Sequence, residues 1–347
     1  VTEIKEDGKD KIFVTDDGKS YRTKSDSECI MFGEDAAAMS CVLNKNNKNL
    51  DIMLGISNKG KSAKIAGVKK SKLTEFVGEL NVVLFSPEDL QIVKGSPSLR
   101  REFINREFYQ FSCIYHKYHL MYQHLLKQRN SYLKDMKKNP KDEISLTYLQ
   151  TLTIQLVKLA MYITRERISF VEDIAKLAYE NMLNISNGNE ILEIKYKSSI
   201  LDALGISSVS DAKFSEENIV ELMMKKSLDD IMRGNTKIGP HQDDLEFFIN
   251  NLEARTYASQ GQQRSIVLSL KLSEIHYLKQ KTGDTPVLLL DDVLSELDKN
   301  RQLKLLEAIN ENVQTFITTP SITDIKEDLL KKAKVFKIDK GTIGEFL

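Results

Sequence analysis

The stretch Pro286-Val-Leu-Leu-Leu-Asp-Asp-Val-Leu-Ser-Glu-Leu-Asp298 carries the strongest structural signal in the sequence. Its apolar run, Val287–Leu290, is short and continuous, which is typical of a strand buried on both faces of a parallel sheet. Thr315–Thr318 is similar and is predicted to be a neighbouring strand. Asp291 and Asp292 follow the run directly. We therefore expect two adjacent carboxylates at the carboxyl edge of an open α/β sheet, where such sheets bind ligands.

The carboxylate pair has two interpretations. A phosphate-bound Mg²⁺ needs a hard oxygen ligand, which Asp291 would supply, and hydrolysis needs a second carboxylate to orient water, which Asp292 would supply. Alternatively, the pair is an acidic helix start that caps its own N–H groups. The Ser-Glu-Leu-Asp continuation favours the functional interpretation.

A second motif, Tyr257-Ala-Ser-Gln-Gly-Gln-Gln-Arg-Ser265, precedes a predicted helix from about Gln262 to Lys281. Ser followed by Gly at a helix start offers a hydroxyl, free N–H groups and the positive end of the helix dipole to an anion. The alternative is an ordinary N-cap with a flexible glycine. The motif lies about thirty residues before the carboxylate pair, and this spacing favours the anion site.

Together the two motifs resemble the ABC-type ATPase heads of the SMC class, and specifically those of the RecF family. The likeness runs in order from roughly residue 18 to the C-terminus. The strings that support it are Ser20-Tyr-Arg-Thr23, Phe85-Ser-Pro-Glu-Asp-Leu90, Gly95-Ser-Pro-Ser-Leu-Arg-Arg101, Gly239-Pro-His-Gln-Asp-Asp-Leu245 and Thr315-Phe-Ile-Thr-Thr319.

The resemblance implies an α/β ABC-type ATPase head with an inserted long helical-hairpin arm, and ATP and Mg²⁺ as cofactors. It assigns metal binding to Asp291 and catalysis to Asp292, and it places a switch residue at Thr318–Thr319. The implied nucleotide contacts, made to the γ-phosphate of ATP held by the other subunit or from the D-loop, are Ser259, Gln260, Gly261, Gln262 and Asp298. The family usually has Arg where this chain has Gln242, so a phosphate or DNA contact is not carried over there.

The resemblance further implies a cytoplasmic, nucleoid-associated protein of DNA repair, replication, recombination and the SOS response. It would dimerise around two ATP molecules and clamp double-stranded DNA near single-strand gaps. With RecO and RecR it would help to load RecA. Members of the family are slow DNA-dependent ATPases.

The sequence departs from the family where a P-loop, Gly-x-x-x-x-Gly-Lys-Ser/Thr, should grip the phosphates. No such motif lies upstream of Tyr21. The one pattern match, Gly55-Ile-Ser-Asn-Lys-Gly-Lys-Ser62, is followed by alternating Lys and apolar residues and by Gly67. A P-loop must lead into a helix, so we interpret this match as a hairpin. We expect this chain neither to bind ATP tightly nor to hydrolyse it.

The chain is predicted to have three parts: a β-rich part of the head over 1–102, the helical arm over 103–230 and a C-terminal α/β part over 231–347. The strands predicted in the first part are Ala38–Leu43, Leu50–Leu54, Ala63–Ala66 and Val82–Phe85. A further strand is predicted over Leu245–Ile249. The chain begins with Val, so we expect residues before it to be missing.

Apolar residues recur at alternating steps of four and three from Ile104 to Met136, which predicts one helix of roughly 50 Å. Asn139-Pro140 should end it. A second apolar series, from Leu149 to Ile163 and again from Phe170 to Leu177, predicts a helix that folds back antiparallel. The pattern fits both a bundle core and a projecting arm.

The composition limits the possible functions. Lys+Arg and Asp+Glu number 50 each and the pI is about 7.1, which argues against a general polycation that coats nucleic acid. The three cysteines lack CxxC spacing, which argues against a zinc site or a disulfide scaffold and fits a reducing cytosol. No run of residues is apolar and long enough for a membrane span, and no signal peptide opens the chain.

Clustered basic residues are candidates for sequence-independent DNA contacts, although a solvated surface explains any single lysine equally well. The candidates are the segment Lys59–Lys72, which includes Lys61 and Lys64, then Lys94, Arg100 and Arg101, and the arm tip with Lys127, Arg129, Lys134, Lys137, Lys138 and Lys141. The histidines His116, His119 and His124 are predicted to lie on the surface or in the seam rather than to bind a metal.

Two other functions stay open. One is a catalytically silent head that binds DNA or RecR without nucleotide, which the missing P-loop favours. The other is a different SMC-like ATPase, or a metal-dependent nuclease built on Asp291, Asp292 and Glu296.

Overall fold

A computed structural model describes residues 25–45, 48–70, 78–138, 143–308, 313–321, 330–331, 333–339 and 342–345. The sequence features at Ser20–Thr23, Lys72, Asn139-Pro140 and Lys141 lie outside these residues. The chain forms two compact units. Unit 1 comprises Val1–Pro87, Tyr109–Cys113 and Leu278–Leu347, and unit 2 comprises Glu88–Phe108 and Ile114–Tyr277. The three-part division of the chain at 102 and 230 stays a prediction.

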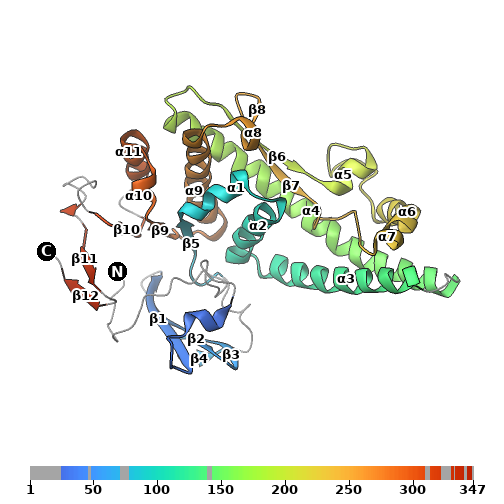
Figure 1. Cartoon of the computed structure of the whole chain (residues 1–347), viewed down its shortest axis with the longest axis horizontal. Coiled ribbons are helices and arrows are strands. Elements are labelled where there is room, and N and C mark those ends of the chain that lie inside the picture. The colour runs from blue at the N-terminus through green and yellow to red at the C-terminus, as the bar shows by residue number, and fades with distance from the viewer. Residues whose placement is uncertain are drawn as a thin grey trace. The chain divides into compact units, whose positions relative to one another are not determined.

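Unit 1 contains a parallel sheet with the order β10-β9-β5 (Figure 1). Its strands are β5 (Val82–Phe85), β9 (Val287–Asp291) and β10 (Thr315–Thr318). Leu288 and Leu290 are both 1% exposed, whereas Val287 and Leu289 on the other face are only partly buried, so β9 is central in the sheet but is not fully buried on both faces as the apolar run predicted. The pairing of β10 with β9 confirms the predicted neighbour and places Thr318 opposite Asp291.

Unit 1 also contains an antiparallel four-stranded meander of β1 (Ala36–Lys45), β2 (Lys48–Ser57), β3 (Gly60–Ile65) and β4 (Val68–Lys69). Its core is formed by Ile52, Leu54, Ala63 and Ile65. The match Gly55–Ser62 spans the β2–β3 hairpin, with Ser57 paired to Gly60. The hairpin interpretation is therefore confirmed, and the described residues that follow, up to residue 70, form β3, a turn and β4 rather than a helix.

The remaining elements of unit 1 among the described residues are short. They are η1 (Asp26–Cys29), α10 (Val293–Glu296), α11 (Lys299–Ala308), and the hairpin of β11 (Phe336–Asp339) and β12 (Thr342–Glu345). At its start, unit 2 has η3 (Pro87–Asp89) and α1 (Leu90–Lys94).

The helical seam predicted from Ile104 to Met136 is divided between two helices, α2 (Pro97–Phe111) and α3 (Cys113–Lys138). The prediction of one helix was wrong at Ser112, because serine favours helix starts over helix interiors. The heptad pattern continues across this break, because the rings of Phe108 and Tyr115 stack on its two sides with their centroids 4.0 Å apart.

The helix α4 (Glu143–Ile185) is continuous and runs antiparallel to α3 (Figure 1). Contacts along the pair, from Tyr118 with Tyr162 to Tyr132 with Tyr148, pair rising residue numbers on α3 with falling ones on α4. The predicted fold-back is confirmed. Near its tip the pair shares a core with Ile231 of α7 (Ser227–Arg233).

The rest of the described part of unit 2 comprises an antiparallel sheet and four further helices. The sheet contains β6 (Leu192–Lys197), β7 (Asp244–Ile249) and β8 (Leu252–Glu253). The helices are α5 (Ser199–Leu204), α6 (Glu216–Lys225), α8 (Ala254–Tyr257) and α9 (Gln260–Thr282), the last of which ends in unit 1. No helix among the described residues has the length and apolarity needed to cross a membrane.

Candidate functional site

The carboxyl edge of the parallel sheet brings Asp291 and Thr318 together. The Thr318 hydroxyl donates to Asp291 Oδ1 at 2.7 Å and accepts the Asp292 N–H at 3.1 Å. Asp291 is 8% exposed, whereas Asp292 is exposed. One hydroxyl therefore orients the buried carboxylate and fixes the backbone of the exposed one.

Asp292 turns the chain sharply from β9 into α10. Its φ of 53° lies in the left-handed region, which non-glycine residues rarely adopt. Such backbone strain persists where the surrounding structure holds it, and it is frequent at functional positions. Here the Asp292 N–H bonds to both the hydroxyl and the carbonyl oxygen of Thr318.

Asp298 precedes α11 and caps its start. Its Oδ1 accepts the Arg301 N–H at 3.0 Å, and its Oδ2 forms an ion pair with the Arg301 guanidinium. The backbone bond from Arg301 is the main reason why the pKa of Asp298 lies below its ordinary value. Asp298 is thus a negatively charged cap on an exposed turn.

The N-terminus of α9 carries the second motif as a capping box. The Ser259 Oγ accepts the Gln262 N–H at 3.2 Å, and Gln262 Oε1 accepts the Ser259 N–H at 2.9 Å. The amides of Gln260 and Gly261, at the first two helical positions, have no partner within the helix. The N-cap interpretation of Ser259 is therefore correct, and two amides remain without an intrahelical partner at the positive end of the helix dipole.

These residues fit a magnesium–nucleotide only in part. The Asp291 carboxylate is a suitable hard ligand, and the amides of Gln260 and Gly261 are suitable donors to a phosphate. The sequence match to a phosphate loop is a β-hairpin, so it offers no helix N-terminus. In the described part of the chain, no three metal-ligating side chains cluster. Glu296, the third carboxylate of the nuclease alternative, lies outside the described side chains.

A buried charged cluster on α9 was missed at the level of sequence. Lys271 Nζ lies 3.5 Å from Asp89 Oδ1 and 3.2 Å from Glu274 Oε1, and it stands over the Phe103 ring. Burial lowers the pKa of Lys271, but the carboxylates of Asp89 and Glu274 raise it more. Burial raises the pKa of the Glu274 carboxyl to about 7. The Lys271 ammonium thus lies between the carboxyl groups of Asp89 and Glu274, and Asp89 is its main charged partner.

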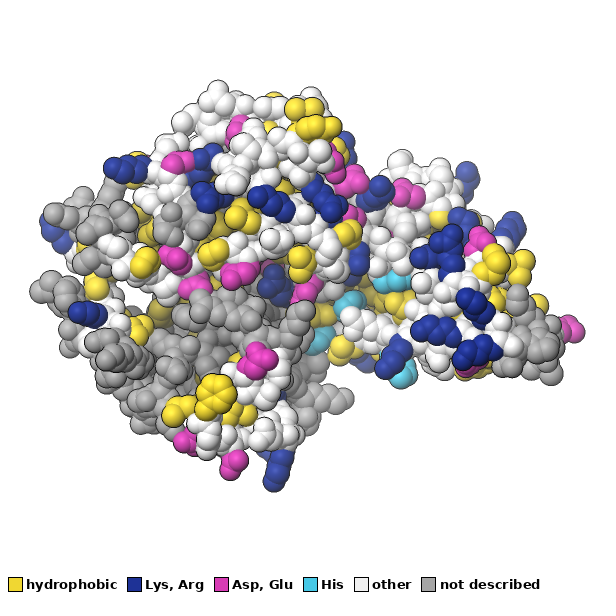
Figure 2. Space-filling model, viewed as in Figure 1, with side chains coloured by type: hydrophobic (Ala, Val, Ile, Leu, Met, Phe, Trp, Pro, Cys, Tyr) yellow, Lys and Arg dark blue, Asp and Glu magenta, His cyan; other side chains and the backbone are white. Residues whose placement is uncertain are grey.

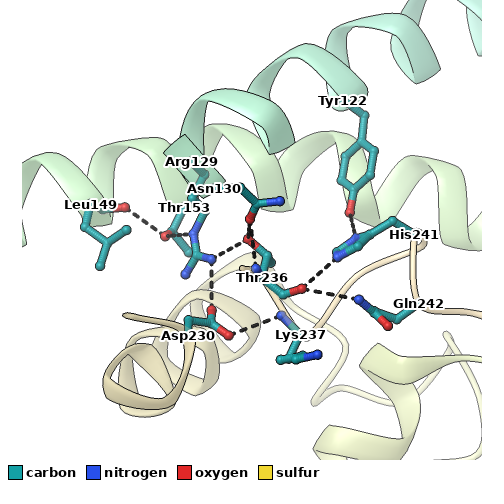
Figure 3. A network of polar contacts seen from close by, with 10 residues as sticks. All are labelled: Tyr122, Arg129, Asn130, Leu149, Thr153, Asp230, Thr236, Lys237, His241 and Gln242. Atoms are coloured by element: carbon teal, nitrogen blue, oxygen red, sulfur yellow. Dashed lines mark hydrogen bonds and ion pairs between the residues drawn. The ribbon is translucent and has the colours of Figure 1, made fainter. Parts of the chain in front are cut away.

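The motif Gly239–Leu245 lies inside unit 2, where His241 holds it in place (Figure 3). The His241 Nε2 donates to the Thr236 carbonyl at 3.0 Å, which leaves Nδ1 to accept the Tyr122 hydroxyl at 2.6 Å. Burial lowers the pKa of His241 to about 4, so the ring is neutral at pH 7. Gln242, where the family usually has Arg, donates to the same carbonyl at 3.3 Å.

Arg129 is the centre of the same network and is not a DNA contact. It is 0% exposed, and its guanidinium bonds to Asp230 at 2.9 Å, Thr236 at 2.6 Å and Thr153 at 3.0 Å. In the sequence, the only indication that Arg129 is buried was its position within the apolar series from Ile104 to Met136. The expectation that Arg129 belongs to the basic arm tip was wrong, because an internal carboxylate neutralises it.

Arg100 is a second correction among the predicted DNA contacts. It is 2% exposed and binds both carboxylate oxygens of Asp244, at 2.6 and 2.9 Å. Arg101 is half-buried and donates to the Asp243 carbonyl at 2.8 Å. Both side chains tie α2 to the start of β7, so we no longer assign them to DNA.

The remaining predicted basic contacts lie at the surface. Lys64, Lys137 and Lys138 are exposed and Lys61 is partly exposed. His119 is 6% exposed and its ring stacks on Tyr115, which confirms its predicted place in the seam.

Comparisons with known proteins give a consistent result, although no protein-family model matches the chain. A "DNA replication and repair protein RecF" of Ligilactobacillus salivarius is 42% identical over 335 residues, which cover 96% of this chain and 86% of that protein. The protein of the same name from Staphylococcus carnosus is 41% identical over 325 residues, covering 94% and 86%.

Two solved structures that resemble this chain are of RecF proteins as well. The recombination mediator protein RecF with ATP, from the RecFOR pathway, matches with a TM-score of 0.84 and 32% identity, covering 95% of this chain and 85% of that one. The corresponding structure described as RecF-ATPrS gives a TM-score of 0.83. The predicted α/β fold of an ABC-type ATPase head is confirmed by these matches.

Proposed function

The chain belongs to the RecF family of DNA replication and repair proteins, and on that premise we propose that it is an ATP-switched, dimerising DNA clamp. It would hold double-stranded DNA beside single-strand gaps, at the nucleoid, and promote RecA loading together with RecO and RecR. The observation that carries this proposal is the pairing of Asp291 with Thr318 at a sheet edge, in a chain that also presents an open helix N-terminus at Ser259.

Each of these two features is half of a nucleotide site. The Asp291 carboxylate, fixed by Thr318, would hold Mg²⁺, and the exposed Asp292 carboxylate would orient a water molecule. The Ser259 hydroxyl and the amides of Gln260 and Gly261 would receive a phosphate bound to a second copy of the chain. ATP with Mg²⁺ would supply a phosphoryl group that can be transferred to water. Binding and dimerisation would therefore be coupled, because each site needs residues from two copies.

A second candidate function is a silent head that binds DNA or RecR without nucleotide. The β-hairpin at Gly55–Ser62 favours it for this polypeptide, since this segment cannot present a helix N-terminus to a phosphate. The two candidates differ in whether ATP changes the complex with DNA.

The test measures the lifetime of the complex on gapped and on intact duplex, with and without Mg²⁺-ATP. It compares this chain with one extended by a RecF-like P-loop start, and with the extended chain carrying Asp292→Asn. The proposal expects ATP to lengthen the lifetime on gapped duplex for the extended chain alone. Asp292→Asn should lengthen it further, because the water would lose its carboxylate.

The outcomes separate the candidates. An extended chain that binds DNA equally well with and without ATP would refute the switch and support the silent head. An extended chain that prefers intact duplex would refute the role at gaps. Nicking of the duplex with Mg²⁺ alone would instead support the nuclease alternative.

A further inference from the structure

Five exposed cations lie on two contacting segments of the helical hairpin that are about one hundred residues apart in the chain. They form what we call the basic arm face: Lys127, Lys134, Lys137, Arg233 and Lys237. Figure 2 shows dark blue side chains concentrated on the part of unit 2 formed by α3, α6 and α7. Arg233 and Lys237 were not among the residues that the sequence suggested for DNA.

The three lysines of α3 share one flank of the helix. Lys127, Asn130, Lys134 and Lys137 follow one another at steps of three, four and three, which places them in one row. The segment 233–237 lies against this row. The Asn130 Oδ1 accepts the Thr236 N–H at 2.8 Å. One turn further along α3, the Lys134 side chain lies so close to Gly234 that a Cβ there would be 2.9 Å from Lys134 Cγ.

Buried bonds fix this segment in place. Asp230 Oδ1 accepts the Lys237 N–H at 3.1 Å, while its Oδ2 receives Arg129 (Figure 3). Gly234 has a φ of 68°, in the left-handed region that glycine adopts without strain, and ends α7 there. The backbone that carries Arg233 and Lys237 is therefore held rigidly against α3, and a rigid surface loses less entropy on binding.

The charges of this face are not neutralised from within. Asp230 is occupied by the internal Arg129, and none of the five cations has an ion pair within the described part of the chain. Asp135 and Asp229 are the exposed acids nearest to them in sequence. Asp135 falls outside the row of α3 that contains Lys134, so the row itself holds cations and amides only.

We propose that the basic arm face binds the sugar–phosphate backbone of duplex DNA, an inference that rests on the proposed function and assigns its contact surface. Lysine and arginine without internal counterions release cations from DNA when they bind phosphates. A protein partner would need an apolar centre within the face. The exposed apolar residues of α7, Leu228 and Met232, lie one helical turn apart, and the exposed residue one turn before Arg233 is the acidic Asp229.

The test uses the full chain and a fluorescently labelled duplex, with affinity measured by anisotropy across a salt series. The variant is Lys134→Gln/Arg233→Gln/Lys237→Gln. The control, Lys195→Gln/Lys197→Gln/Lys225→Gln, removes the same charge from exposed lysines that are each paired with a glutamate. Because the altered side chains are exposed, both variants should keep the helical circular dichroism of the parent chain.

The face variant should lower the slope of log affinity against log salt by about 0.9 for each lost phosphate contact, and should weaken binding roughly tenfold or more at 0.1 M salt. The control should change the slope by less than one contact. If the parent chain binds duplex and the face variant keeps its slope, the assignment of this face is refuted while the proposed function stands. If the parent chain does not bind duplex even at low salt, the assignment of this face is refuted, whereas the proposed function is tested separately by ATP and the extended chain. A parallel titration with labelled poly-glutamate tests an acidic protein as the partner. If the face variant loses affinity for poly-glutamate but not for duplex, the face serves an acidic protein and the inference is also refuted.

Discussion

Replacing Asp230 by alanine should strongly destabilise the helical unit, because it leaves the Arg129 guanidinium buried without a counterion. The side chain of Arg129 is 0% exposed and that of Asp230 is 5% exposed, so water cannot substitute. Breaking a buried ion pair by removing one partner costs about 3–5 kcal/mol. The change also removes the acceptor of the Lys237 N–H. We therefore expect Asp230→Ala to cost at least about 3 kcal/mol.

The double variant Arg129→Met/Asp230→Asn provides the matched control. It removes both charges and keeps an acceptor for Lys237. The hydroxyls of Thr153 and Thr236 still donate to the Leu149 carbonyl and to Asn130 Oδ1. With no charge stranded, this variant should cost only about 1 kcal/mol, the worth of an ordinary hydrogen bond.

The assay is urea unfolding followed by far-ultraviolet circular dichroism, since the chain has no tryptophan and the helices α3 and α4 are long. A cost of less than about 1 kcal/mol for Asp230→Ala would contradict the burial penalty expected for an unpaired Arg129. A double variant as unstable as the single one would contradict it equally, because the penalty would then not come from the unpaired charge.

Three further predictions concern the head. Glu274→Gln should stabilise the protein above about pH 7 and flatten its stability between about pH 4.5 and 7, because the raised pKa makes ionisation of Glu274 costly as the pH rises. Ser259→Ala should cost about 1 kcal/mol and speed amide exchange at Gln262, whereas Ser259→Asp should preserve the cap. Thr318→Val should cost about 1–3 kcal/mol in urea unfolding, since Asp291 loses its donor and the Asp292 N–H loses an acceptor, whereas Thr318→Ser should cost less.

Each of these predictions has a result that contradicts it. A Glu274→Gln protein that loses stability as strongly as the parent between pH 5 and 7 would show that Glu274 ionises freely. Unchanged exchange at Gln262 in Ser259→Ala would remove the capping role of Ser259. Equal losses for the valine and serine variants of Thr318 would mean that its hydroxyl bonds contribute nothing measurable.

The sequence predicted those parts of the fold in which one short pattern determines one structure. The four aliphatic residues before Asp291 could form little other than a buried strand, and the structure has β9 there. The sequel to Gly55–Ser62, with alternating lysines, was incompatible with a helix and is a hairpin. Ser259 precedes a polar helix start, and its capping bond is present. In each case the deciding contacts are local in the chain.

Features that depend on distant partners could not be predicted. Arg100 and Arg129 appear in the sequence as members of basic clusters, but Asp244 and Asp230, each more than one hundred residues away, bind them internally. The break at Ser112 was hidden because aromatic stacking continues the apolar seam on both sides of it. Arg233 joins the basic arm face only because the segment after α7 folds back onto α3.

The most direct test of the central claim is the mass of the particle measured by light scattering during size-exclusion chromatography, with Mg²⁺ and with or without ATP. It compares this chain with the chain extended by a RecF-like P-loop start. ATP should produce a dimer of the extended chain only, because Ser259 of one copy needs a phosphate held by the other. An ATP-dependent dimer of this chain alone would contradict the hairpin interpretation of Gly55–Ser62. No dimer from either chain would contradict the nucleotide switch itself.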